Sequence, residues 1–306
     1  MPLQMIRIKK RTLWLLASAV LAALIISVVL WPQSQYGMEG FRFSYAKDRP
    51  LPRVEKQPID APEDLVGYAL QYQSREFLGE KITIHARLYL PSGRTGLPGV
   101  VLLPGGGNTK EVEAPLAERI ARLGYAVLTY DQRGLGETGG QYLGFMQDAQ
   151  VFAGGQEPVQ HLSVYDALTS FDVLRSVPEV DNQRIVMMGE SMGGRYAIIA
   201  GALDDRIRGV IAISSAGFHV PEIGDTLQNQ YLLSIDPDQY IGMIAPRHLV
   251  MLHGDNDTMV PLDNANSTYA LAGEPKAFYV AAGCGHGFCD GMMDDLEKEL
   301  AGISRP

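Results

Sequence analysis

The chain has 306 residues, of which 46% are hydrophobic and 20% are charged, so it can bury a sizeable core. Lysine and arginine number 26 against 35 aspartate and glutamate residues, which gives a formal net charge of −9. Beyond the N-terminus the sequence has no run of basic residues, and this argues against nucleic acid as a partner.

The N-terminal 31 residues have the pattern of a signal anchor. Four basic side chains lie in the short segment 1–11, and an uncharged stretch of nineteen residues follows from Leu13 to Trp31. As a helix this stretch would be roughly 28 Å long, close to the hydrocarbon thickness of a bilayer. The preceding positive charges predict a cytoplasmic N-terminus and an extracytoplasmic body. We therefore expect one transmembrane helix at 12–31. The alternative is a signal peptide that is cleaved from a secreted protein.

Residues 32–62 are interpreted as a tether, because five prolines punctuate them and they show little periodicity. The remaining residues, 63–306, are expected to form the folded domain. Its first two strands, 67–74 and 82–90, are predicted to pair antiparallel.

Strands and helices then alternate along the chain. Apolar strands are expected at 99–103, 125–130, 184–188, 209–213, 248–252 and 277–280, and helices at 111–123, 164–175, 192–202 and 292–301. This order predicts an α/β fold with a mostly parallel central sheet and helices on both faces. Ligands of such sheets bind beyond the carboxyl ends of the strands. Residues 214–247 interrupt the alternation and are predicted to form a short cap insertion.

A candidate nucleophile lies between the predicted strand 184–188 and the predicted helix 192–202. The motif Gly189-Glu190-Ser191-Met192-Gly193 matches G-x-S-x-G in the strand-turn-helix context that gives this motif its meaning. The glycines would allow a strained turn that leaves the serine hydroxyl free. The alternative is a tight turn that simply requires small residues.

A serine hydroxyl needs a base, and the base needs an orienting group. His286 follows the last predicted strand in a glycine-rich loop, and it is the preferred base among the six histidines. Asp255 and Asp257 both follow the predicted strand 248–252. The order Ser191, Asp257, His286 is that of the α/β-hydrolases.

The stretch Leu103-Pro104-Gly105-Gly106-Gly107-Asn108 leaves one strand and enters a helix. Its glycines allow the backbone to approach a substrate, and backbone N–H groups there can stabilise a developing negative oxygen. The amides of Gly106 and Met192 are the predicted oxyanion hole. A phosphate-binding loop is the weaker interpretation, because the residues that both nucleotide motifs require are absent.

With these motifs, residues 65–306 resemble the α/β-hydrolase superfamily, and more narrowly its dienelactone-hydrolase-like and prolyl-oligopeptidase-like esterase and peptidase branch. The segments 102–111, 130–140 and 253–261 are similar to the oxyanion, D-x-R-G-x-G-x-S and acid-loop segments of that branch. Pro104 stands where many members have histidine, and Thr138 replaces the serine. The resemblance places the acid on Asp257, makes Asp255 a loop-forming residue, and implies structural roles for Asp131 and Arg133.

The resemblance implies a serine hydrolase that cleaves carboxylic esters of small molecules through an acyl-enzyme, without a cofactor or metal. A peptidase or amidase with the same three residues is the main alternative, and an acyltransferase or a binding protein on this fold stays open. Activity is expected to fall when His286 is protonated at acid pH. Phe218, Tyr231 and Tyr240 in the predicted cap would line the substrate pocket or, equally, form the buried face of the cap.

The only cysteines of the chain, Cys284 and Cys289, bracket His286. Three interpretations are open at this point: a disulfide that stiffens the loop, two free thiols, or metal ligands that act with His286 and Asp290.

Overall fold

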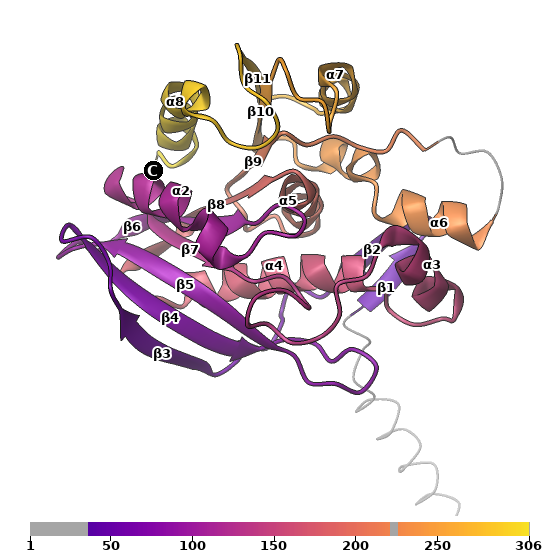
Figure 1. Ribbon diagram of the computed structural model, residues 1–306, viewed down its shortest axis with the longest axis horizontal. Helices are drawn as coiled ribbons and strands as arrows, with labels where there is room; N and C mark the ends of the chain where they lie inside the picture. Colours follow the sequence, from indigo (N-terminus) through magenta and orange to yellow (C-terminus); the bar gives the residue numbers. More distant parts are fainter. Residues whose placement is uncertain (1–35, 221–225, 306) are drawn as a thin grey trace, which may run out of the picture.

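The computed structural model describes residues 36–220 and 226–305, and these are built around a nine-stranded sheet (Figure 1). The strand order is β11-β10-β9-β8-β6-β7-β5-β4-β3. The bounds of the strands are β3 Val54–Ile59, β4 Leu65–Gln73, β5 Thr83–Pro91, β6 Leu97–Leu103, β7 Ala126–Tyr130, β8 Val180–Glu190, β9 Gly209–Ile213, β10 His248–Gly254 and β11 Lys276–Ala281. Neighbouring strands pair parallel from one edge of the sheet through β11, β10, β9, β8, β6 and β7. The remaining strands, β5, β4 and β3, extend the sheet antiparallel. The expected mostly parallel sheet is therefore confirmed.

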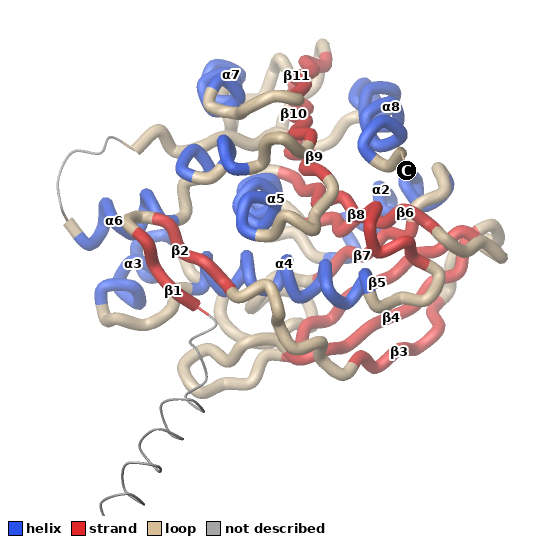
Figure 2. Tube along the Cα trace, turned by 180° about the vertical axis from the view of Figure 1, so that it is seen from behind, coloured by secondary structure: helices blue, strands red, loops and turns tan. Residues whose placement is uncertain are grey.

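Helices cover both faces of the sheet because its central strands are apolar on both sides. On one face lie α4 (Val159–Arg175), α5 (Met192–Leu203) and α7 (Leu262–Ala270), and on the other lie α2 (Lys110–Arg122) and α8 (Met293–Ile303) (Figure 2). Along β8, for example, Met187 packs with the first set and Met188 packs with the second. The alternation of side chains along each strand thus produces two hydrophobic layers.

The order of the strands also determines where a ligand site can form. From β6 the chain passes to β7, its neighbour on one side, and later to β8, its neighbour on the other side. The loops after β6 and β8 therefore lead to helices on opposite faces of the sheet, α2 and α5. Such a switch point opens a crevice at the carboxyl ends of the strands. Leu103 at the end of β6 pairs with Gly189 near the end of β8, so the two motif-bearing loops leave the sheet side by side.

The segment between β9 and β10 contains α6 (Leu227–Ser234) and two short 3-10 turns, η1 (Pro237–Gln239) and η2 (Ile241–Met243). Helix α6 lies against α3 (Phe145–Ala153), which the sequence analysis did not anticipate (Figure 1). Tyr231 of α6 and Ile235, which directly follows this helix, share a small apolar cluster with Ala149 and Phe152 of α3. The cap is thus formed by two insertions, and only the one after β9 was expected.

The interpretation of residues 32–62 as a tether is wrong from Tyr36 onward. Strand β3 is an edge strand of the main sheet and pairs antiparallel with β4. Strands β1 (Tyr36–Glu39) and β2 (Arg42–Tyr45) form a hairpin, and Phe43 of β2 is buried against His161 and Tyr240. Pro58 is compatible with this pairing because it lies on an edge strand.

The expected transmembrane helix at 12–31 lies outside the described residues. Within the part of the chain that the structure describes, no helix is both long enough and apolar enough to cross a membrane.

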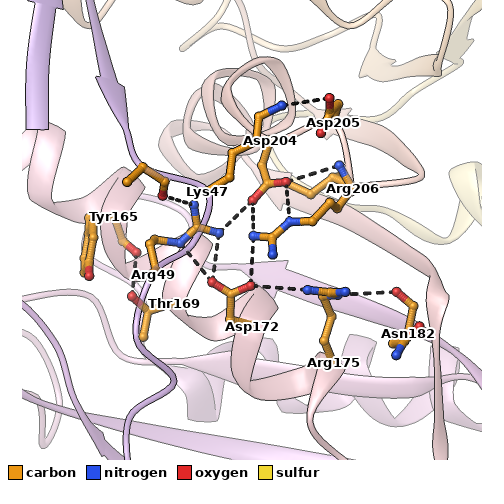
Figure 3. Close-up of polar contacts among 12 residues, drawn as sticks. Lys47, Arg49, Tyr165, Thr169, Asp172, Arg175, Asn182, Asp204, Asp205 and Arg206 are labelled. Atoms are coloured by element: carbon orange, nitrogen blue, oxygen red, sulfur yellow. Dashed lines mark hydrogen bonds and ion pairs between the residues drawn. The ribbon is translucent and has the colours of Figure 1, made fainter. Parts of the chain in front are cut away.

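A buried ion-pair network attaches the segment after β2 to the body of the fold (Figure 3). The guanidinium of Arg49 lies 2.8 Å from Asp172 on α4 and 2.7 Å from Asp204 at the end of α5. Arg206 bonds to both carboxylates as well. Burial alone would raise the pKa of Asp204, but the hydrogen bonds from Arg206 and Arg49 lower it to about 2. Asp204 is therefore charged at neutral pH.

Replacing Arg49 with methionine is expected to lower the free energy of unfolding by about 3–5 kcal/mol, because it leaves buried carboxylates with fewer partners. Lys47→Met is the matched control, since Lys47 pairs with Asp205 at 2.7 Å but both side chains are more than half exposed. That change is expected to cost less than about 1 kcal/mol. Urea denaturation measures both. Equal losses would show that the Arg49 network does not hold the N-terminal segment.

Candidate active site

Ser191 occupies the turn between β8 and α5 in a strained backbone conformation. Its φ of 49° and ψ of −113° lie in a region that residues with a side chain rarely adopt. The turn is fixed by its neighbours, because the amide of Ser191 donates to Ile213 O at 2.8 Å and Ser215 Oγ donates to Ser191 O at 2.9 Å. The G-x-S-x-G segment thus has the strand-turn-helix context that the sequence predicted.

The two outer glycines of the motif are required by close backbone contacts. A Cβ at Gly189 would lie 2.4 Å from the carbonyl of Gly193, and a Cβ at Gly193 would lie 2.3 Å from Leu103 O. Distances this short are not tolerated by packed atoms, so both positions must lack a side chain. The sharp turn and the close approach of β6 therefore explain the glycines.

His286 and Asp257 are in direct contact, although 29 residues separate them. Nδ1 of His286 lies 2.8 Å from Asp257 Oδ2 and 3.0 Å from Oδ1. Burial raises the pKa of Asp257, but hydrogen bonds from the Val260 amide, from His286 and from the Met259 amide outweigh burial, so the net pKa is lowered. The carboxylate therefore stays charged beside the imidazole.

The loop that carries His286 is fastened on three sides. Cys284 and Cys289 form a disulfide, which decides between the three interpretations of these residues and rules out free thiols and metal ligands. The Gly287 amide donates to Ser214 Oγ at 3.0 Å, and the Phe288 amide donates to Glu190 Oε2 at 3.3 Å. The imidazole is thus held on a constrained loop at the carboxyl edge of the sheet.

The glycine-rich loop after β6 approaches the nucleophile turn closely. A Cβ at Gly106 would lie 3.5 Å from Cε of Met192. The amide of Gly105 donates to Glu113 Oε1 at 3.4 Å, so the amide of Gly106 is the better candidate in this loop. Met192 begins α5, where the helix leaves its first N–H groups without intrahelical acceptors. The two predicted oxyanion donors therefore flank Ser191.

A cavity of about 500 Å³ brings these residues together. Ser191, His286, Gly106 and Met192 all line it, as do Tyr142, Phe145, Gln160, Glu190, Arg195 and Met259, which sequence analysis did not single out. A second cavity of about 290 Å³ shares Ser191, Arg195 and Met259 with the first and includes Phe218. Phe218 therefore lines the second cavity, which is one of the two roles that the sequence left open for it.

Tyr231 and Tyr240 do not line either cavity, and the prediction that they are pocket residues is wrong. Both side chains are fully buried. The hydroxyl of Tyr231 donates to Asp148 at 2.8 Å, and the hydroxyl of Tyr240 donates to Ser234 O at 2.7 Å. They belong to the interior of the cap, because their hydroxyl groups find partners inside it.

Asp131 and Arg133, which the family resemblance made structural, hold the loops that flank the site. Asp131 accepts from the Lys110 amide at 2.8 Å and from its ammonium at 2.7 Å, so it caps the start of α2. Arg133 is buried and pairs with Asp166 at 2.6 Å. Asp255 accepts from the Gly283 amide at 2.7 Å, as a loop-forming residue would.

Two acidic side chains lie behind the oxyanion loop. Glu113 of α2 is buried, and it shares a small cavity with Glu190 of the nucleophile motif. Burial and the charge of Glu190 raise the pKa of Glu113 to about 7, against smaller opposing effects of hydrogen bonds from Asn108 and Gly105. Burial also raises the pKa of Glu190. Ionisation of these two carboxyl groups therefore lowers the stability of the fold, and the loss increases as the pH rises.

The change Glu113→Gln should become relatively stabilising with rising pH. In the wild type the carboxyl group of Glu113 binds its proton more tightly in the folded state than in the unfolded state. Stability is therefore lost as the pH rises from about 4.5 to about 7. The amide lacks that ionisation, and the variant should gain on the order of 2 kcal/mol relative to wild type between pH 5 and pH 8. Thermal unfolding at both pH values measures the difference. A constant difference would contradict a raised pKa for Glu113.

The fold and the arrangement of these loops define an α/β-hydrolase. The family model for acetyl xylan esterase (AXE1) matches residues 49–217, more than half of the chain, and the protein belongs to this family. The suspected superfamily is therefore confirmed.

Individual relatives are more distant. The chain is 29% identical over 182 residues to the uncharacterized protein YfhR of Escherichia coli O157:H7, a match that covers 56% of this chain and only 57% of YfhR. An acetyl xylan esterase from Paenibacillus sp. R4 superposes with a TM-score of 0.70 at 19% identity, covering 83% of this chain and 89% of that chain. A glucuronoyl esterase from Solibacter usitatus gives 0.63 at 15% identity, with 88% of each chain covered. At these identities the structural likeness establishes the fold.

Proposed function

We propose that the protein is a serine hydrolase that cleaves carboxylic esters, with Ser191 as nucleophile, His286 as base and Asp257 as the residue that orients the imidazole. The observation that carries the proposal is the contact of Asp257 with Nδ1 of His286, whose side chain lines the same cavity as Ser191. Membership of an esterase family supports ester bonds as the target.

In this mechanism Asp257 accepts from Nδ1 of His286, which leaves Nε2 free to take the proton of Ser191. The serine oxygen attacks the ester carbonyl, and the amides of Gly106 and Met192 stabilise the negative oxygen of the tetrahedral intermediate. His286 then donates its proton to the leaving alcohol. Water attacks the resulting acyl-enzyme with the same base, which releases the acid and restores Ser191.

A panel of matched esters and amides tests the proposal against the peptidase and amidase alternatives. We expect the full-length protein to hydrolyse p-nitrophenyl acetate and butyrate, and Ser191→Ala to give only the uncatalysed rate. The corresponding p-nitroanilides are expected to react far more slowly. Faster cleavage of the anilides would favour an amidase. A folded wild-type protein no more active than Ser191→Ala on the whole panel would reject hydrolysis of these bonds.

We further propose that residues 12–31 anchor the protein in a membrane with the hydrolase domain outside the cytoplasm. The basic segment before the apolar stretch supports this orientation. The Cys284–Cys289 disulfide supports an oxidising compartment. The protein should sediment with membranes, and protease should reach the domain only from the extracytoplasmic side. A shortened soluble product would indicate a cleaved signal peptide instead.

A further inference from the structure

The two cavities beside Ser191 meet at one cationic side chain, that of Arg195. Arg195 lies one helical turn after Ser191 on α5, and its amide donates to Ser191 O at 3.2 Å. It lines both the larger and the smaller cavity. His286 lines the larger cavity, whereas the smaller one is lined by Phe218, Val260 and Asn264. Arg195 thus lies between two cavities, both of which Ser191 also lines.

Two aromatic rings from the cap fix this guanidinium in position. Cζ of Arg195 lies 4.5 Å from the ring centre of Phe218 and 5.3 Å from that of Phe145. The two rings contact each other edge to face, with their centres 5.4 Å apart. Ring contacts stabilise a cation but accept none of its five N–H donors. Both cap insertions therefore hold the cation in place while its donors stay available.

Arg195 has no acidic partner among residues 36–220 and 226–305, although its side chain is partly buried. Among these residues the guanidinium contacts only the two rings, and none of their carboxylates lies within 4.0 Å of it. The carboxylates nearby have other partners: Asp236 accepts from the Phe218 amide, and Glu190, which lines the larger cavity with Arg195, accepts from the Phe288 amide. Other buried arginines, such as Arg49 and Arg133, are paired with aspartate.

Burial lowers the pKa of Arg195, because desolvation of the cation outweighs the attraction of Tyr196 and Asp236. A partly buried cation without an acidic partner costs free energy in the empty site, and an anion that binds there offsets part of this cost. The arrangement is therefore suited to a ligand with a negative charge near Ser191.

We propose that Arg195 binds a carboxylate at the far end of the acyl group, so that the preferred substrates are monoesters of short dicarboxylic acids. This rests on the proposed ester hydrolysis. His286 delivers a proton to the leaving alcohol, so the alcohol belongs in the cavity that His286 lines, and the acyl chain belongs in the smaller one. Ser191 and Arg195 both line the smaller cavity, whose volume of about 290 Å³ has room for an acyl chain of succinyl or glutaryl length. Guanidinium and carboxylate form paired, charge-assisted hydrogen bonds.

The test uses chain-matched pairs of p-nitrophenyl esters, butyrate against hemisuccinate and pentanoate against hemiglutarate. Within each pair a terminal methyl group is replaced by a carboxylate. The Ser191→Ala protein supplies the background, which is higher for esters with an internal carboxylate. We expect the wild-type ratio of kcat/KM, anionic over neutral, to be about tenfold or more. In Arg195→Gln this ratio should fall to about one or less, and Arg195→Lys should retain part of it.

Arg94→Gln is the matched control. Arg94 is exposed in the turn between β5 and β6, at the opposite end of the sheet, so its loss removes the same net charge without touching the site. It should keep the wild-type ratio. A wild-type ratio of one or less, or a preference that survives Arg195→Gln, would overturn the proposal. A preference for 4-acetoxybenzoate over 4-methylphenyl acetate, without any acyl-side preference, would overturn the assignment to the acyl group.

Calorimetric titration of glutarate separates this proposal from the proposed function. The Ser191→Ala protein should bind glutarate at least about tenfold more tightly than pentanoate, and Ser191→Ala combined with Arg195→Gln should lose that difference. If no ester is hydrolysed but the difference is found, the hydrolase proposal fails and the anion site stands. If esters are hydrolysed but glutarate shows no binding that depends on Arg195, the anion site is rejected and the hydrolase proposal stands.

Discussion

Replacing His286 with alanine is expected to lower kcat/KM for p-nitrophenyl butyrate by about four orders of magnitude, because Ser191 loses the base that accepts its proton. The loop should keep its shape, since the Cys284–Cys289 disulfide and the Gly287 amide contact with Ser214 do not involve the imidazole. Steady-state kinetics measures the loss, and circular dichroism checks the fold.

The control for this change is His248→Ala. His248 begins β10, the strand whose other end leads to Asp257, and it pairs with Glu299 rather than with any residue of the site. Activity should stay within about threefold of wild type for this variant. Comparable losses for the two variants would contradict a role for His286 as base.

Asp257→Asn is expected to lower kcat by about 10³–10⁴-fold with little change in the fold. Asparagine can still accept from the Val260 amide, but its amide group cannot replace the charge beside His286 Nδ1 or hold the same tautomer. Because the pKa of Asp257 is lowered, the wild-type carboxylate remains ionised over the pH range in which the variant is compared with it.

Asp255→Asn in the same loop provides the comparison for Asp257. Its carboxylate accepts from the Gly283 amide and does not contact the imidazole. We expect a loss of no more than about fivefold, from a small shift of the loop. If Asp255→Asn reduced activity as strongly as Asp257→Asn, the acid would have to be reassigned.

The sheet could be predicted because its strands are continuously apolar and its helices have clear periodicity. The strand at 209–213 was predicted with the bounds that β9 has. Strands β1 and β2 were missed because each has only four residues, and β3 was missed because it is mostly polar and contains Pro58, so tertiary pairing decides their structure. Helix α3 was missed because it packs on α6 rather than on the sheet, and of its residues only Asp148 and Ala149 are buried.

The candidate site was predictable where function requires a motif and unpredictable where it depends on the cap. Ser191, Asp257 and His286 follow strand ends in a recognisable order, and the structure brings all three to one edge of the sheet. Tyr231 and Tyr240 share the cap segment with Phe218, and only packing separates the interior pair from the residue that faces the cavity. Arg195 and Glu113 carried no signal, because a single charged residue on a helix is ordinarily solvated.

The most direct test of the account is to locate the adduct of an active-site-directed fluorophosphonate. The reagent phosphonylates a serine only where a base and an oxyanion hole activate it. The full-length protein should carry one adduct, on the peptide that contains Ser191, and both Ser191→Ala and His286→Ala should remain unlabelled. An adduct on another serine, or equal labelling of the Ser191→Ala protein, would contradict the assignment of Ser191 as the nucleophile.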